Sequence, residues 1–238
     1  MRNQLTRSLK NILPGVMLSG SLFASFPLSA QVEAIVGDRQ PALTESFAVQ
    51  RIDDLDNLSF IEMINSVPLD SKSAELIRKF QEKEGRNRLH NKEYNPKNGC
   101  SVETFRNKEV LLVTIPASRL FTPNEVELSD SADELLSPLK RYLKDPDMYR
   151  VLIVMHTDNT GSELYRDHLT EERASALFDW FVQQRVDTRY LFPYAMSDDM
   201  PLYPNDTMDH RESNRRLEVY LVPGKKMLDQ AKSGRIVF

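Results

Sequence analysis

Short apolar runs and helically spaced apolar residues alternate along the second half of the chain. Two mostly apolar runs, 109–116 and 149–155, are rich in valine, leucine and isoleucine, and the first ends on Pro116. Runs of this length and composition predict strands buried inside a sheet. Residues 190–195 and 216–222 are similar in length. We expect the former to be a short edge strand and the latter to be the last strand.

The segments between these strands carry apolar residues at helical spacing. Apolar residues recur at intervals of three and four positions in 130–144 and again in 163–184, which predicts one amphipathic helix in each segment. Ser129 or Ser131 is expected to cap the first helix and Ser162 the second, because a serine hydroxyl accepts a hydrogen bond from an unpaired backbone N–H.

The order of these segments, β-α-β-α-β-β, predicts an α/β sandwich with helices packed on one side of a small mixed sheet. Pro138 lies inside the first predicted helix, where it must bend the helix or remove one of its hydrogen bonds. In the last strand, Arg216 and Glu218 alternate with apolar residues. This alternation indicates that the two charged side chains lie on the solvent face.

The first thirty residues have the pattern of a secretory signal peptide. Arg2, Arg7 and Lys10 precede a mostly apolar stretch, 12–26, and small residues follow at a position suited to cleavage. The stretch is short and is interrupted by proline and glycine, which is untypical of a membrane span. We therefore expect residues 1–30 to be removed on export; an N-terminal anchor helix that is never cut is the alternative.

Residues 31–97 carry a looser pattern than the rest of the chain. No long apolar period precedes residue 58, which is typical of a linker, and the apolar spacing of 70–84 then predicts a helix capped by Asp70 or Ser71. The changes in pattern divide the chain into four parts. These are a signal peptide at 1–30, a linker and helical region at 31–97, a compact domain at 98–223 and a basic tail at 224–238.

Charge and cysteine content narrow the range of functions. The chain carries 31 basic and 35 acidic residues, and removal of the first thirty residues takes away three basic ones, which leaves 28 against 35 and a formal charge of −7. This acidic balance argues against a nucleic-acid partner, because binding to a phosphate backbone depends on basic residues. Cys100 is the only cysteine, so no internal disulfide can form, and its apolar neighbours indicate a buried thiol.

The sequence contains no motif of a catalytic or cofactor site. It lacks a nucleophile elbow, a phosphate-binding loop, a dinucleotide fingerprint and the zinc-protease pattern. His156, His168 and His210 match no usual zinc spacing. We therefore expect a binding protein without metal or cofactor, and not an enzyme.

Polar residues instead gather in four blocks of the predicted compact domain. The blocks read HTDNTG at 156–161, LTEERA at 169–174, NDT at 205–207 and NRRLEV at 214–219. In order and spacing they resemble the OmpA-like domain pattern GHTD, N-x-x-L-S-x-x-R-A and N-x-T-x-x-G-R-x-x-N-R-R-V-E. Leu120-Phe121 also matches the early L-F of that family, and the resemblance extends over the whole predicted domain.

The resemblance to the OmpA-like domain family implies non-covalent binding of peptidoglycan through the diaminopimelate of its stem peptide. The side chain of diaminopimelate ends in one ammonium and one carboxylate. The acid of the family pattern is here Asp158, which would accept from the ammonium. The arginine is Arg173, whose planar fork of N–H donors suits a carboxylate. Thr157, Asn214 and Arg215 are implied as further residues of the same site.

Three single positions and one stretch depart from the family pattern; the stretch is the glycine-rich one before the last block, which is replaced here by residues 193–197. Met155 stands in place of the first glycine, Arg166 in place of an asparagine, and His210 in place of the glycine before the last block. We expect the side chains of Met155 and His210 to narrow or reshape the pocket. These departures leave an alternative function open, that of a periplasmic protein-interaction scaffold with a degenerate pocket.

Structural roles also remain open for the site residues. Asp158 and Arg173 can form an ordinary surface ion pair, and Asn214 and Arg215 can tie the last strand to the neighbouring loops. The expected ligand is peptidoglycan with a diaminopimelate-type stem peptide. Outer-membrane or periplasmic proteins are expected as further partners through residues 31–97. The expected location is the periplasm, in association with the outer membrane.

Overall fold

The computed structural model describes residues 60–65, 69–85, 89, 94–145 and 147–238. The predicted signal peptide and the predicted linker before residue 58 lie outside these described residues. The α-helices, 3-10 helices (η) and strands are α4 Phe60–Ile64, α5 Ser71–Glu84, η2 Pro96–Asn98, β1 Ser101–Phe105, β2 Val110–Pro116, η3 Ala117–Arg119, α6 Ala132–Leu136, η4 Ser137–Leu143, β3 Tyr149–His156, α7 Glu163–Gln183, β4 Leu191–Ala195, α8 Met208–Asn214, β5 Arg216–Pro223 and α9 Lys225–Lys232.

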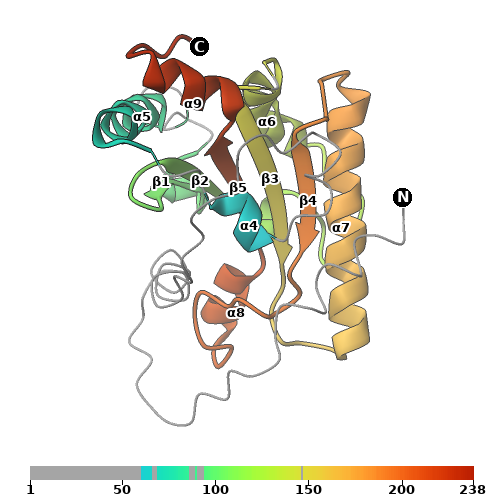
Figure 1. The fold of residues 1–238 in the computed structure, drawn as a ribbon. Coiled ribbons are helices and arrows are strands. Elements are labelled where there is room, and N and C mark those ends of the chain that lie inside the picture. The colour runs from blue at the N-terminus through green and yellow to red at the C-terminus, as the bar shows by residue number, and fades with distance from the viewer. Residues whose placement is uncertain (1–59, 66–68, 86–88, 90–93, 146) are drawn as a thin grey trace.

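A five-stranded mixed sheet in the order β1-β2-β5-β3-β4 forms the centre of the molecule (Figure 1). Neighbouring strands are antiparallel except for β4, which pairs parallel to β3 with Val151 opposite Leu191. β4 is therefore an edge strand, as predicted, and the predicted fold class is confirmed. β5 is the middle strand, and all of its residues are buried.

Different elements cover the two faces of the sheet. Side chains on one face, such as Ile153 and Val219, form the main core together with residues of α5, α6, η4, α7 and α9. On the opposite face Phe60 of α4 packs edge-on against Tyr194 and Tyr220. Figure 1 shows α4 in front of the strands and α7 alongside β4.

The segment predicted as one helix at 130–144 divides into α6 and the 3-10 helix η4. The change falls at Pro138, the second residue of η4, because proline has no backbone N–H to donate to an α-helical bond. The predicted serine cap of this helix is wrong. Ser129 and Ser131 direct their hydroxyls to the carbonyl of Arg119, at 3.4 and 3.2 Å, and Ser131 makes no capping hydrogen bond.

The caps of the two longer helices are confirmed. The Ser162 hydroxyl accepts from the backbone N–H of Tyr165 at the start of α7, at 3.2 Å. The Asp70 carboxylate accepts from the backbone N–H groups of Lys72 and Ser73 at the start of α5, both at 3.0 Å. Each helix therefore begins where the sequence places a side-chain acceptor.

Two segments outside the predicted compact domain pack onto it. In α5, Ile77 enters the main core and the Gln81 amide donates to the carbonyl of Glu109 at 2.8 Å. Within the predicted basic tail, residues 225–232 form α9, which packs against α5. The apolar side of α9 is buried in the main core and consists of Met227, Leu228 and Ala231.

The sequence pattern did not predict β1, α4, α8 or α9. Each is only five to eight residues long, so its apolar residues complete too few periods to stand out from the chain around them. Across the described ranges, no helix is long and apolar enough to cross a membrane, and no group of three or more side chains is arranged to hold a metal ion.

Candidate functional site

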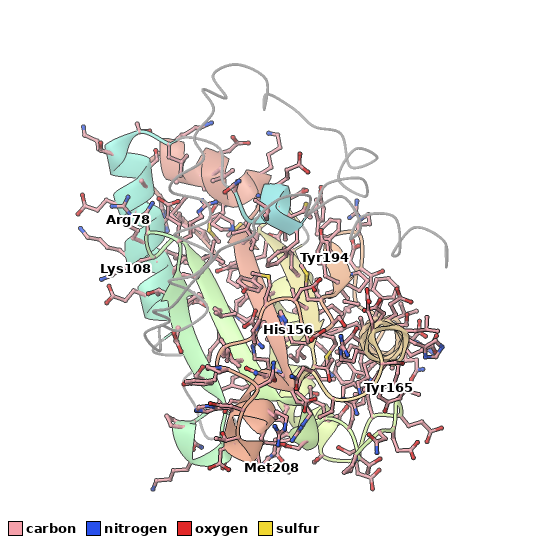
Figure 2. The ribbon with its side chains drawn as sticks, turned by 90° about the horizontal axis from the view of Figure 1, so that it is seen from below. Arg78, Lys108, His156, Tyr165, Tyr194 and Met208 are labelled. Carbon is pink, nitrogen blue, oxygen red and sulfur yellow. The ribbon has the colours of Figure 1, made fainter. Side chains whose placement is uncertain are left out.

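Two of the polar blocks meet at one end of the sheet. The HTDNTG block leads from the end of β3 to α7, and the NRRLEV block leads from α8 into β5. Because β3 and β5 are antiparallel, with His156 opposite Arg216, the end of one strand lies beside the start of the other. Figure 1 shows α8 and the start of α7 at this lower end. Figure 2 looks onto it, with Met208 on α8 and Tyr165 on α7.

Asp158 is a fully buried carboxylate that accepts three hydrogen bonds. Thr160 donates its backbone N–H to Oδ1 at 2.7 Å and its hydroxyl to the same oxygen, while Arg215 donates through Nη1 to Oδ2. Burial alone would raise the pKa of Asp158, but the hydrogen bonds from Thr160 and Arg215 outweigh burial and hold the pKa below its ordinary value. Asp158 is therefore an ionised acceptor at neutral pH.

Arg173 lies on the buried side of α7 and is only 4% exposed. Its Nε donates to the carbonyl of Glu125 at 2.9 Å and its Nη2 to that of Thr122 at 3.4 Å, while the guanidinium lies 4.7 Å from the ring centre of Phe121. Within the described ranges, no carboxylate lies within ion-pair distance of Arg173. A buried cation with only neutral partners is poorly compensated, so the site suits an added anion.

Asp158 and Arg173 do not pair with each other, so the alternative of a simple ion pair between them is wrong. Asp158 pairs instead with Arg215, whose side chain is 30% exposed, and Arg215 also donates through Nη2 to Glu212 of α8. Burial lowers the pKa of Arg173, and the positive charge of Arg215 lowers it further. Of the two guanidinium groups, that of Arg215 is the more exposed.

Asn214 and Thr157 hold the segments that carry the charged residues. Asn214 is fully buried, and its amide donates to the carbonyl of Tyr203 at 2.8 Å and accepts from the backbone N–H of Tyr203 at 3.0 Å. Thr157 is 5% exposed, and its backbone N–H donates to the carbonyl of Ser197 at 2.8 Å. Asn214 thus ties the end of α8 to the preceding loop, as its structural alternative predicted.

Two of the residues that depart from the family pattern have structural partners. Met155 is fully buried in the main core on the helix-bearing face of the sheet. The ring of His210 stacks on Tyr203 with centroids 5.1 Å apart, and its Nδ1 lies 2.6 Å from an Asp206 oxygen. These contacts do not support the expectation that Met155 and His210 narrow the pocket.

The loop between β3 and α7 is fixed by Arg166 and Gly161. Arg166 donates through Nε to Asp198 and through Nη1 to the carbonyl of Gly161, both at 2.8 Å. Gly161 has a φ of +86°, and a Cβ added to it would lie 2.8 Å from the Tyr165 ring. Only glycine fits both the backbone conformation and this close approach. The third departure, Arg166, therefore stabilises the loop that carries Asp158.

Arg216 and Glu218 do not lie on a solvent face, which corrects the prediction from strand alternation. Both are 1% exposed; Glu218 accepts from Arg216 Nε at 2.8 Å and from the Tyr220 hydroxyl at 2.7 Å, and it lies 3.2 Å from His156 Nε2. Burial would raise the pKa of Glu218, but Arg216 and His156 lower it to about 2. The alternation of faces was predicted correctly, but β5 is central and other segments cover both of its faces.

Three residues of the site were missed by sequence reasoning. Thr160 had a usable signal, because a threonine two positions after an aspartate often returns both its N–H and its hydroxyl to the aspartate side chain. Glu212 stands three positions before Arg215, a spacing at which helical side chains meet. Phe121 was recognised only as part of the early L-F of the family pattern. No local sequence pattern indicates that its ring contacts the Arg173 guanidinium.

Comparisons with known proteins identify the segment that carries this site. A family model described as the OmpA family matches residues 120–215. Outer membrane protein A of Bordetella avium is 25% identical over 114 residues, which is 48% of this chain and 59% of that protein. YiaD of Escherichia coli (strain K12), named as a probable lipoprotein, is 23% identical over 125 residues, which is 52% of this chain and 57% of that protein.

A solved structure supports the same fold. The crystal structure of a MotB-like protein from Desulfovibrio vulgaris has a TM-score of 0.54 at 21% identity and covers 63% of this chain and 95% of that chain. At this identity the likeness concerns the fold alone, and the chain matches less than two thirds of the length of the two curated relatives. Residues 120–215, which contain Asp158, Arg173 and Arg215, form a domain of the OmpA family.

Proposed function

We propose that this protein binds peptidoglycan non-covalently through the diaminopimelate of the stem peptide, and so anchors or organises the cell envelope. One observation carries the proposal. Asp158 is a buried, ionised carboxylate held by Thr160 and Arg215, and Arg173 is a buried guanidinium that has no carboxylate partner in the described part of the chain. The match to the OmpA family and the name outer membrane protein A of one relative support an envelope location, in the periplasm and close to the outer membrane.

The chemistry of the site suits a head group with two opposite charges. The ammonium of diaminopimelate would donate to Asp158, and its carboxylate would accept paired N–H donors from Arg173. Both contacts form away from bulk water, where hydrogen bonds between charged groups contribute about 1.5–3 kcal/mol each. Thr157 and Asn214 would act by holding the loops in place, and Arg215 would contact the ligand from the exposed side.

A second candidate function is a periplasmic protein-interaction scaffold whose pocket no longer binds the wall. The observation that favours it is the burial of both binding residues, because Asp158 is 0% and Arg173 4% exposed. Arg215 also donates to Asp158. In this function the charged residues would only stabilise the loops around α8.

A binding assay on cell-wall sacculi separates the two functions. The exported protein is sedimented with purified diaminopimelate-type sacculi, alongside Asp158→Asn and Arg173→Lys. A ligand charge left without its partner costs on the order of 2–4 kcal/mol, so each variant should bind roughly thirty- to a thousandfold more weakly. A wall whose stem peptide carries lysine lacks the second carboxylate and should bind poorly to the unmutated protein.

The matched control for this assay is Arg189→Lys. Arg189 forms an exposed ion pair with Asp187, just before the start of β4 and at the opposite end of the sheet from Asp158, so this variant should bind like the unmutated protein. Thermal unfolding shows whether each variant is folded at the assay temperature. Equal binding of both wall types, or full binding by Arg173→Lys, would exclude the proposed mechanism and favour the scaffold.

A further inference from the structure

We propose that Arg215 competes with the ligand for Asp158, and that exchange of this ion pair selects a head group carrying an ammonium and a carboxylate together. The inference rests on the proposed function of the site. It assigns to Arg215 a role in specificity that differs from simple attraction of the ligand carboxylate.

Arg215 is the partly exposed partner of Asp158. The side chain of Asp158 is 0% exposed, whereas the Arg215 side chain that pairs with it is 30% exposed. Thr160 occupies Oδ1 with two hydrogen bonds made within the loop, and Arg215 occupies Oδ2. An incoming ammonium therefore reaches Asp158 by taking the place of the guanidinium on Oδ2.

Arg215 has a second anchor that remains when it leaves Asp158. Its Nη2 donates to Glu212, which stands three positions earlier on α8 and is 46% exposed. A guanidinium has five N–H donors in a planar fork, so it can keep Glu212 while its other edge turns from Asp158. The displaced guanidinium, still held by Glu212, would then share the ligand carboxylate with Arg173.

The balance of charge favours a head group that carries both charges. The two cations Arg173 and Arg215 and the two carboxylates Asp158 and Glu212 sum to zero. A head group with one ammonium and one carboxylate preserves this balance and gives every charge a partner. A lone ammonium leaves one extra positive charge in a partly buried site, and a lone carboxylate cannot displace Arg215 from Asp158. Unpaired charges away from water are strongly unfavourable.

Titration with two soluble probes tests the exchange. The probes are uncross-linked muropeptides of the diaminopimelate type and of the lysine type, and the full exported protein is compared with Arg215→Gln. With the competitor removed, the lysine-type probe should bind about tenfold more tightly, because its ammonium no longer displaces a cation. The diaminopimelate-type probe gains the same tenfold but loses a charged donor worth about a hundredfold, so it should bind about tenfold more weakly and the preference should fall about a hundredfold.

The control for this titration is Arg189→Gln, which neutralises an exposed cation at the far end of the sheet and should leave both affinities unchanged. Equal weakening of both probes by Arg215→Gln makes Arg215 an ordinary contact and overturns the exchange, and so does an unchanged preference. An unmutated protein that binds neither probe overturns the proposed function as well. If Asp158→Asn abolishes binding but Arg215→Gln keeps the preference for the diaminopimelate-type probe, the exchange is overturned and the proposed function stands.

A structure of the unmutated protein with bound diaminopimelate-type muropeptide provides a test that does not depend on the folding of a variant. We expect the ligand ammonium on Oδ2 of Asp158, and the Arg215 guanidinium turned toward Glu212 and the ligand carboxylate. A complex in which Arg215 still donates to Asp158 contradicts the exchange.

Discussion

Two arginines that are neighbours in the sequence form ion pairs of opposite character. Arg216 pairs with Glu218 where both are 1% exposed, and the Tyr220 hydroxyl also donates to Glu218. Arg215 pairs with Asp158 while remaining 30% exposed. Successive residues at the start of a strand point in different directions. A step of one residue therefore separates a pair in which both side chains are buried from a pair in which one side chain remains partly exposed.

The comparison indicates which charges serve the fold and which are available for binding. A fully buried ion pair adds little net stability, but removal of one partner costs about 3–5 kcal/mol because the remaining charge stays buried. Removal of one partner from an exposed pair costs less stability, because water or a ligand replaces the missing partner. Mutation of the Arg216–Glu218 pair should therefore change mainly the free energy of unfolding. Mutation of the Arg215–Asp158 pair should change mainly the affinity for the ligand.

The largest effect is expected from Glu218→Gln. This change leaves Arg216 buried without its carboxylate and should lower the free energy of unfolding by about 3–5 kcal/mol. Glu212→Gln, which removes the 46% exposed partner of Arg215, should lower it by less than about 1 kcal/mol. Urea denaturation of both variants measures the difference. Similar losses in the two variants would contradict the distinction between the pairs.

Acid should weaken the buried cluster more than the rest of the molecule. The pKa of Glu218 is about 2 in the folded protein and 4.5 ordinarily, so its contribution is present above pH 4.5 and is lost as the pH falls toward 2. Burial and Arg216 also lower the pKa of His156 below 6.5, so its contribution likewise decreases as the pH falls below 6.5. Together these shifts predict falling stability from about pH 6.5 downward.

The pH dependence of the unfolding midpoint measures this contribution. In the unmutated protein, Glu218 should account for up to about 3 kcal/mol between pH 4.5 and 2. Glu218→Gln removes the titrating group, so the midpoint of this variant should decrease less steeply over the same range. An equally steep decrease in both proteins would assign the acid sensitivity to other groups.

Sequence alone predicted the central elements and the polar blocks, but not the environment of the charged residues. The apolar runs of β2 and β3 and the long spacing of α7 are local patterns, and they were confirmed. The alternation around Arg216 and Glu218 indicated which residues share a face. It carried no information on which distant segments cover that face, because the covering of β5 depends on the order of strands in the sheet.

The candidate site shows the same limit. The spacing of Asp158 and Arg173 and the family resemblance predicted that the two residues serve one site, and this stays a prediction. The direct partner of Asp158 is Arg215, which lies 57 positions away, and the register of β3 against β5 decides that contact. Thr160 and Glu212 act within three residues of their partners, so local spacing could have identified both.

The loop that carries Asp158 should be more sensitive to substitution than its exposure suggests. Gly161→Ala combines a φ of +86° with a Cβ 2.8 Å from the Tyr165 ring, and we expect a loss of about 1–3 kcal/mol in stability. Gly234→Ala is a matched control, because its φ is +87° but no atom lies within 4 Å of the added Cβ. It should cost only about 1 kcal/mol. Equal losses in the two variants would show that the Tyr165 contact contributes nothing.

The smallest expected effect is that of Glu212→Gln on ligand affinity. The proposed exchange keeps the Arg215–Glu212 hydrogen bond while the guanidinium rotates away from Asp158. Loss of the Glu212 charge should therefore destabilise the ligand-bound protein more than the ligand-free protein. Exposed charged pairs contribute about 0.2–1 kcal/mol, so binding of the diaminopimelate-type probe should weaken only about two- to fivefold. The control is Asp229→Asn, which removes a 52% exposed carboxylate paired with Lys225 in α9, away from the site. Calorimetric titration at constant ionic strength resolves a change of this size. A Glu212→Gln protein with unchanged affinity would mean that Arg215 leaves Asp158 without using this anchor, and the ligand carboxylate alone would then hold the displaced guanidinium.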